Sequence, residues 1–186
     1  ETSKEILAFL ERIGAKGKLH WSQTEPAGIS GSVTAAFTPA TVQGRYPVEG
    51  TMSLGLEPDG RILMREAQLR SGPASVVAEG TIVPDEESAD LRLTASSEDL
   101  VESAPLVGAL AGAFGAHPDA WDLETLGGRG VISGNATIRE EEIRSEGSFV
   151  APRLAWRSVD WGEATGGYRL DPDALEISKA HASRNG

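Results

Sequence analysis

Residues Asp90-Leu-Arg-Leu-Thr-Ala95 alternate strictly between polar and apolar side chains. Successive side chains of a β-strand point to opposite faces of its sheet, so this stretch predicts a strand with one dry and one wet face. Leu91 and Leu93 share the dry face, and the polar residues between them share the wet face. The same period of two recurs on both sides of this segment.

Alternation extends along most of the chain. It covers Leu19 to Trp21, Val33 to Phe37, Met52 to Leu56, Val131 to Ile138, Ile143 to Ala151, Leu154 to Trp161, Gly167 to Leu170 and Leu175 to Ala182. Residues that favour tight turns separate several of these runs, as at Pro58-Asp-Gly60, Pro84-Asp-Glu86 and Pro172-Asp173. The sequence therefore predicts a mainly β chain built from many strands.

Two segments show helical rather than strand periodicity. Residues 1–14 begin with capping side chains and carry a helical apolar stripe, formed by Ile6, Leu7, Phe9, Leu10 and Ile13. We predict an N-terminal helix there. A second helix is predicted over Pro105 to Phe114, within an insertion near residues 104–115. The remainder of residues 15–186 is predicted to be a repeating β segment.

A long-period similarity supports that repetition. Leu56-Glu-Pro-Asp59 matches Leu170-Asp-Pro-Asp173, and the apolar residues after each turn also align. A repeated turn with its following strand indicates a repeating β architecture. Chance matching of common turn residues is the alternative. The last residues, Ser183-Arg-Asn-Gly186, are typical of a hairpin turn, which favours a chain excised from a longer one.

Composition narrows the function classes. The 186 residues correspond to about one domain, and the net charge of -11 disfavours nucleic acid as a partner. There is no cysteine, and the three histidines are isolated in sequence, so no metal site is predicted. The glycines from Gly127 to Gly134 depart from the spacing of a dinucleotide fingerprint, and no serine lies in a GxSxG motif. We therefore expect no enzyme and no cofactor.

The inward-facing positions of the predicted strands mix small and large apolar residues. Strands lined in this way either pack close under another layer or leave an apolar hollow, and both interpretations stay open. Trp156 and Trp161 lie five residues apart in one predicted strand, so they are expected on opposite faces.

Several of these strands also resemble a known family. Val48-Glu-Gly-Thr-Met-Ser-Leu-Gly-Leu56, Ala78-Glu-Gly-Thr-Ile82 and Gly130-Val-Ile-Ser-Gly-Asn-Ala-Thr-Ile138 are similar to the repeats of the translocation and assembly module protein (TamB) and the wider AsmA-like, bridge-type lipid-transfer family. The resemblance covers most of Gly31 to Gly186. It implies an elongated, curved, mostly antiparallel sheet with an apolar trough, described as β-taco-like. It also implies part of an inner-membrane-anchored, periplasmic protein of a diderm bacterium, acting in lipid transport and outer-membrane biogenesis.

The resemblance and the alternation together give a candidate groove for phospholipid acyl chains. Its candidate residues are Met52, Leu54, Leu56, Leu91, Leu93, Ile132, Ile138, Phe149, Leu175 and Ile177. The other expected partners are neighbouring repeats of the same chain and an outer-membrane assembly protein. The alternative function is a closed β-sandwich that serves as an adhesion or assembly module without a ligand.

Overall fold

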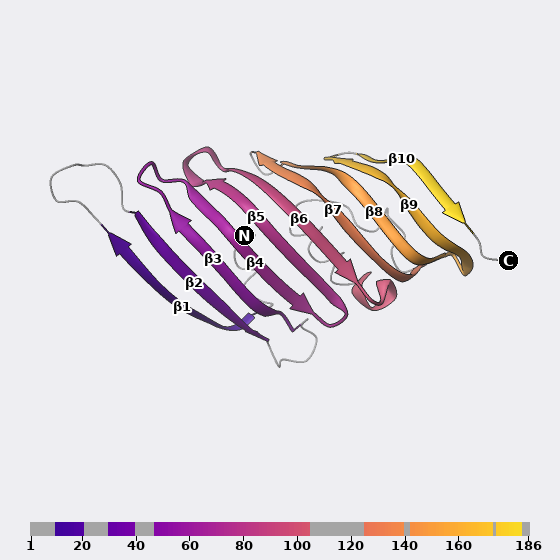
Figure 1. Ribbon diagram of the computed structural model, residues 1–186, viewed down its shortest axis with the longest axis horizontal. Coiled ribbons are helices and arrows are strands. Elements are labelled where there is room, and N and C mark those ends of the chain that lie inside the picture. The colour runs from indigo at the N-terminus through magenta and orange to yellow at the C-terminus, as the bar shows by residue number, and fades with distance from the viewer. Residues whose placement is uncertain are drawn as a thin grey trace.

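The computed structural model describes residues 10–20, 30–39, 47–104, 125–139, 142–172 and 174–183. Within these ranges the chain forms one ten-stranded antiparallel sheet, in which each strand pairs with the next along the chain (Figure 1). The strands are β1 (Leu10–His20), β2 (Ser30–Pro39), β3 (Glu49–Leu56), β4 (Ile62–Ser71), β5 (Ala74–Val83), β6 (Ser88–Ser97), β7 (Leu126–Arg139), β8 (Glu142–Trp156), β9 (Val159–Asp171) and β10 (Ala174–Ser183). The predicted mainly β, elongated antiparallel fold is confirmed.

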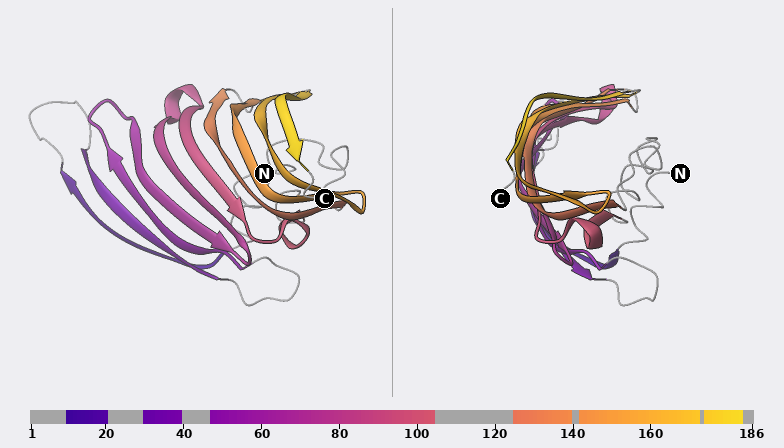
Figure 2. Two further views of the ribbon diagram at one scale, coloured as in Figure 1. Left: turned by 45° about the vertical axis from the view of Figure 1, so that its right-hand side comes forward. Right: turned by 90° about the vertical axis from the view of Figure 1, so that its right-hand side faces the viewer.

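The sheet is strongly curved. Seen along its long axis it has a C-shaped profile, because each strand bends between its two ends (Figure 2, right). The trough defined by this curve therefore runs across the strands, along the direction in which they stack.

The pairing register places one set of side chains on the inside of the curve. Leu93 on β6 pairs with Ala78 on β5 and with Gly134 on β7, and directly paired residues share a face. Along β2 from residue 31 to 38, and along β8 from 142 to 150, the residues of this face are half-buried while the intervening ones are exposed. This difference between the faces matches the crowding expected on the concave side of a curved sheet.

The described residues form no conventional core. No side chain among them is fully buried, and the buried apolar residues are all alanines, namely Ala67, Ala89, Ala104, Ala136, Ala151 and Ala164. The accessible surface is 12540 Å², whereas a compact chain of this mass exposes about 8,600 Å². The fold is held together chiefly within one layer of strands.

Glycines occupy concave positions at which neighbouring backbones come too close for a side chain. A Cβ atom on Gly80 of β5 would overlap the carbonyl oxygen of Asp90 on β6, and the backbone φ of Gly80 is 153°. The directly paired Gly134 and Gly147 show the same overlap with each other's strands. Only glycine combines this close approach with such a backbone conformation.

Short helical pieces lie at the strand ends. The 3-10 helix η1 (Pro84–Glu86) connects β5 to β6, and residues 100–104 form a helical turn after β6. The Asp99 side chain caps that turn by accepting a hydrogen bond of 3.1 Å from the backbone N–H of Glu102. The helix predicted over residues 105–114 lies outside the described residues.

The predicted N-terminal helix over residues 1–14 is wrong where the structure describes it. Residues 10–14 belong to β1, which pairs with β2 from Leu10↔Pro39 to His20↔Ser30. An isolated helix of this length is marginal in water, whereas pairing with β2 satisfies the backbone along the whole segment. Residues 1–9 of the prediction lie outside the described ranges.

The strand predicted from Leu154 to Trp161 is also wrong. The chain turns at Arg157 and Ser158, whose φ values are 50° and 63°, and Trp156 at the end of β8 pairs with Val159 at the start of β9. The two tryptophans therefore lie on neighbouring strands rather than on opposite faces of one. Two positive φ angles define this kind of tight hairpin, which usually carries Asn-Gly, so the residues gave no turn signal.

We expect Gly80→Ala to destabilise the fold by at least about 2 kcal/mol, because its Cβ atom would collide with backbone and its φ is unfavourable for alanine. Gly130→Ala is the matched control, since its Cβ atom would meet the nearest atom at 3.4 Å, which is ordinary contact. Urea unfolding measures both. Equal stability losses in the two variants would contradict the role assigned to Gly80.

Candidate functional site

The concave face holds all ten residues that the sequence singled out. The register of β2 to β10 places them on the same side as Leu93. They belong to five strands, β3, β6, β7, β8 and β10, so the shared face extends from β3 to β10. The structure thus brings together residues that are more than a hundred positions apart in sequence.

The same face contains further apolar residues that the sequence analysis did not assign to a groove. They are Val33, Ala35, Phe37, Ile62, Met64, Leu69, Val76, Ile82, Leu154 and Leu170. Most follow the alternation already used for the others. In β4, however, a bulge between Met64 and Ala67 adds one residue and shifts the alternation. Simple counting across that bulge would assign Ala67 to the wrong face.

Charged side chains lie on the opposite, convex face. Glu79 and Arg92 pair directly across β5 and β6 and form an ion pair of 3.2 Å. Glu146, Arg169 and Glu176 line up in one row across β8, β9 and β10. Throughout β3 to β9, every charged residue that pairs across the sheet lies on this face. The concave face is therefore mainly apolar, and none of the charged residues that pair across β3 to β9 lies on it.

Nothing in the described ranges covers the apolar face. Ile132 lies in β7, with three strands on one side and six on the other, yet 44% of it is exposed. Leu175 and Ile177 on β10 are about half exposed as well. A residue in the middle of a wide sheet is normally buried under a second layer, because one apolar face must be covered. Here the described strands supply no such layer.

The dimensions of this face follow from the sheet itself. Ten strands spaced about 4.8 Å apart give a face about 43 Å long in the stacking direction. One leaflet of a bilayer has a hydrocarbon thickness of about 15 Å. The concave face is long enough to hold more than one acyl chain end to end.

Polar atoms do reach the concave face at Tyr168 and Ser145. Their hydroxyl oxygens lie 3.1 Å apart, and the Ser145 hydroxyl donates a 3.0 Å hydrogen bond to the carbonyl oxygen of Asn135. The Tyr168 hydroxyl also lies over Gly134, where a Cβ atom would approach it to 2.7 Å. Because these hydroxyls bond to each other and to backbone, they interrupt the apolar lining without adding a charge.

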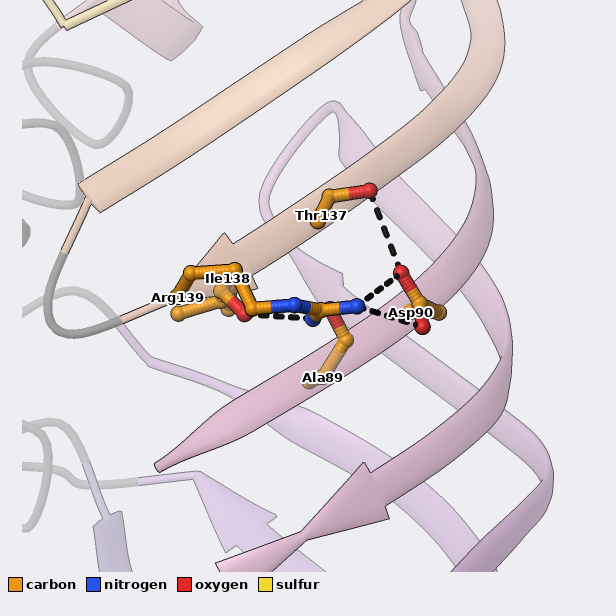
Figure 3. A network of polar contacts seen from close by, with 5 residues as sticks. All are labelled: Ala89, Asp90, Thr137, Ile138 and Arg139. Carbon is orange, nitrogen blue, oxygen red and sulfur yellow. Dashed lines mark hydrogen bonds and ion pairs between the residues drawn. The ribbon is translucent and has the colours of Figure 1, made fainter. Parts of the chain in front are cut away.

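A network of polar contacts joins β6 to β7 on the convex face (Figure 3). Arg139 donates from Nη2 to both carboxylate oxygens of Asp90, at 3.0 and 2.8 Å, and from Nη1 to the carbonyl oxygens of Ala89 and Ile138. The Thr137 hydroxyl donates to the same carboxylate at 3.2 Å. The hydrogen bonds from Arg139, followed by that from Thr137, hold the pKa of Asp90 below its ordinary value of 3.8.

The convex face also has open hollows. The larger hollow has a volume of about 1140 Å³ and lies near the β8–β9 turn. Side chains of both charge signs line it, including Arg129, Arg153, Asp160 and Glu163. A smaller one of about 510 Å³ lies over β7 to β10 beside Glu146, Arg169 and Glu176. Neither brings together a nucleophile and a base in a buried site, which acyl transfer or hydrolysis requires.

In comparisons with known proteins, no family model, curated protein or solved structure matches the chain. Across the ranges that the structure describes, no three His, Asp or Glu residues converge as a metal site. No helix in those ranges has the length and apolar character of a transmembrane span. The geometry of the sheet is therefore the basis for any functional conclusion.

We expect Asp90→Asn to lower the free energy of unfolding at pH 7 by at most about 1 kcal/mol, because the ion pair is exposed and screened by solvent. Folding lowers the pKa of Asp90, so its contribution is present above pH 3.8 and is lost as the pH falls through the lower value of the folded state. Urea unfolding at pH 7 and well below pH 3.8 tests this. A difference between variant and parent that does not shrink in acid would contradict it.

Proposed function

We propose that the concave face binds the acyl chains of phospholipids and that the protein acts, without catalysis, in lipid transport between membranes and outer-membrane biogenesis. One observation carries the proposal: an extended, mainly apolar face about 43 Å long, without charged residues among its paired positions from β3 to β9, that no described segment covers. Exposed apolar surfaces of this extent mark binding sites in soluble proteins.

The energetics favour long chains. Each buried methylene group contributes about 0.8 kcal/mol, and association costs about 4–15 kcal/mol. Net binding therefore requires more than about 5 to 19 buried methylene groups, depending on the cost of association. A chain of that length laid along the trough would contact several strands, including β6 and β7, where Leu91, Leu93 and Ile132 lie.

The charge distribution favours low head-group selectivity. Selective recognition of a phosphate or an amine uses fixed charges or convergent polar groups. Such groups lie on the convex face here, for example in the Arg139–Asp90 pair. We expect the acyl chains to be bound within the trough and the head groups to remain at its open side, in contact with water.

The sheet edges agree with the proposed partners. On β10 every residue from 174 to 182 is exposed, and its outer edge has no partner strand in the described part of the chain. Open edges pair readily with another strand. We propose that neighbouring repeats of a longer chain or an outer-membrane assembly protein occupy such edges. The resemblance to the TamB and AsmA-like family supports a periplasmic location in an inner-membrane-anchored protein.

The alternative architecture, a closed β-sandwich, requires two sheets that face each other. The described strands form one sheet instead, and its apolar side faces the inside of the curve. The adhesion or assembly module without a ligand therefore loses its structural basis within these strands.

We expect Leu93→Glu to keep a cooperative thermal melt but to weaken binding of a fluorescent long-chain fatty acid by about tenfold or more. An open trough leaves the new carboxylate in water when empty, whereas a bound acyl chain would desolvate it. Fluorescence titration and calorimetry measure the two properties.

Thr94→Glu is the matched control. It introduces the same charge one residue away, on the convex face, where Thr94 contacts Ser133 at 3.2 Å. Its fatty-acid binding should equal that of the parent. The proposal fails if the parent binds no fatty acid, or if both variants bind as well as the parent does.

A further inference from the structure

The hairpin between β8 and β9 carries exposed apolar side chains on both sides of its turn. Trp156, Val159 and Trp161 flank the turn and are 43%, 45% and 43% exposed. The hairpin forms the lower right-hand tip of the sheet in Figure 1. In contrast, the apolar residues that flank the turns at 57–61 and 84–87, namely Leu56, Ile62 and Val83, are half-buried. Solvent alone does not favour two indole rings at such a tip.

The surroundings of the tip extend this apolar character. Val101, on the helical turn after β6, is 53% exposed and lies against the base of β7, with its Cγ2 atom 3.6 Å from the position of a Cβ atom on Gly127. The Arg157 guanidinium stacks over the Trp156 ring, 5.1 Å from its centroid. Tryptophan and arginine have apolar bodies with polar ends, and such residues concentrate at membrane–water interfaces.

The tip is continuous with the concave face. Leu154 and Trp156 follow Phe149 and Ala151 along the concave side of β8, while Arg153 pairs with Arg129 on the convex side. No charged residue therefore lies between the middle of the trough and the hairpin tip along this side of β8. An acyl chain could leave a bilayer at the tip and enter the trough over apolar surface throughout.

We propose that the β8–β9 hairpin tip, formed by residues 156–161, inserts into the interfacial region of a lipid bilayer and joins it to the trough. The choice of a bilayer over a protein partner rests on the proposed function, because the apolar path to the trough is what favours it. Insertion itself is a separate property and can be tested without the trough.

The charged residues near the tip predict how its binding depends on the lipid composition of the bilayer. Arg129, Arg153 and Arg157 lie near the tip, but Asp160 and Glu163 lie there too, and the whole chain carries a net charge of -11. Attraction to anionic lipids is therefore offset by repulsion. We expect insertion of the apolar side chains to dominate, so that neutral and anionic vesicles bind comparably and added salt changes binding little.

The test is co-sedimentation of the whole chain with vesicles of phosphatidylcholine, alone or mixed with phosphatidylglycerol. The parent should bind both kinds of vesicle. The partition coefficient of the double variant Trp156→Ser/Trp161→Ser should be lower by about tenfold or more. The matched control is Val77→Ser/Val131→Ser, which removes two similarly exposed apolar side chains from the convex face. It should sediment with vesicles as the parent does.

A second measurement covers the case in which the double tryptophan variant does not fold. Replacing Trp21 and Trp121 by Phe leaves the two tip residues as the fluorophores, and brominated phosphatidylcholine should quench them. A parent that binds neither vesicle, unchanged binding of a folded double variant, or tip residues that are not quenched would each overturn the inference. Binding to neither vesicle would assign the tip to a protein partner instead.

The two proposals fail separately. Leu93→Glu should retain vesicle binding while it loses soluble fatty acid, and the tip variant should retain soluble fatty acid while it loses vesicles. If the tip variant loses neither, membrane insertion is wrong and acyl binding by the trough stands. If Leu93→Glu keeps both fatty-acid binding and vesicle binding while the tip variant loses vesicle binding, the trough proposal is wrong and insertion stands. Insertion would then no longer be supported by an apolar path into a lipid-binding trough.

Discussion

Close approach of neighbouring backbones at the concave glycines is the constraint on which the rest of the structure depends. At Gly80, and at the facing pair Gly134 and Gly147, a side chain would overlap a carbonyl oxygen of the next strand. Glycines at such positions allow a sheet to bend more sharply than the gentle twist of an ordinary open sheet. With them, the ten strands bend in the same sense, and a single layer acquires an inside and an outside (Figure 2).

The consequence of that curvature is an apolar surface with no protein layer over it in the described ranges. Most soluble domains bury the apolar side of a sheet against helices or a second sheet. Here the inner side keeps Ile132 at 44% exposure, and the charged face lies outward, where cross-strand pairs such as Arg92 with Glu79 contact solvent. The strand ladders and the small buried alanines supply the cohesion, so the inner face remains available for a ligand.

Much of this could be predicted from alternation alone. A half-buried antiparallel strand shows a clean period of two, so Leu91 and Leu93 on β6 and Phe149 on β8 were assigned to one face correctly, as the register shows. The period of two in the sequence does not indicate how far a sheet bends. The glycines do not indicate it either, because a glycine at a close backbone approach and a glycine in open space look alike in sequence. The curvature itself was therefore expected only through the family resemblance.

Local features that break the usual rules were missed. The β8–β9 turn uses Arg157 and Ser158 at positive φ in place of Asn-Gly, so a hairpin was predicted as a continuous strand and the exposed tip went unnoticed. Near the N-terminus, Leu10 and Ile13 fit a helical stripe, but pairing with β2 makes them part of a strand. In both places long-range pairing outweighed a local pattern.

The claim that the concave face binds acyl chains is tested most directly by methyl NMR with a spin-labelled long-chain fatty acid. The convex face offers matched reporters, because Val77, Val131 and Val150 are as exposed as Ile132. The account predicts that the label broadens the methyl signals of Leu91, Leu93 and Ile132 more strongly than those of the three valines, because the broadening falls steeply with distance. Equal broadening on both faces, or none on the concave face at saturating fatty acid, would contradict it.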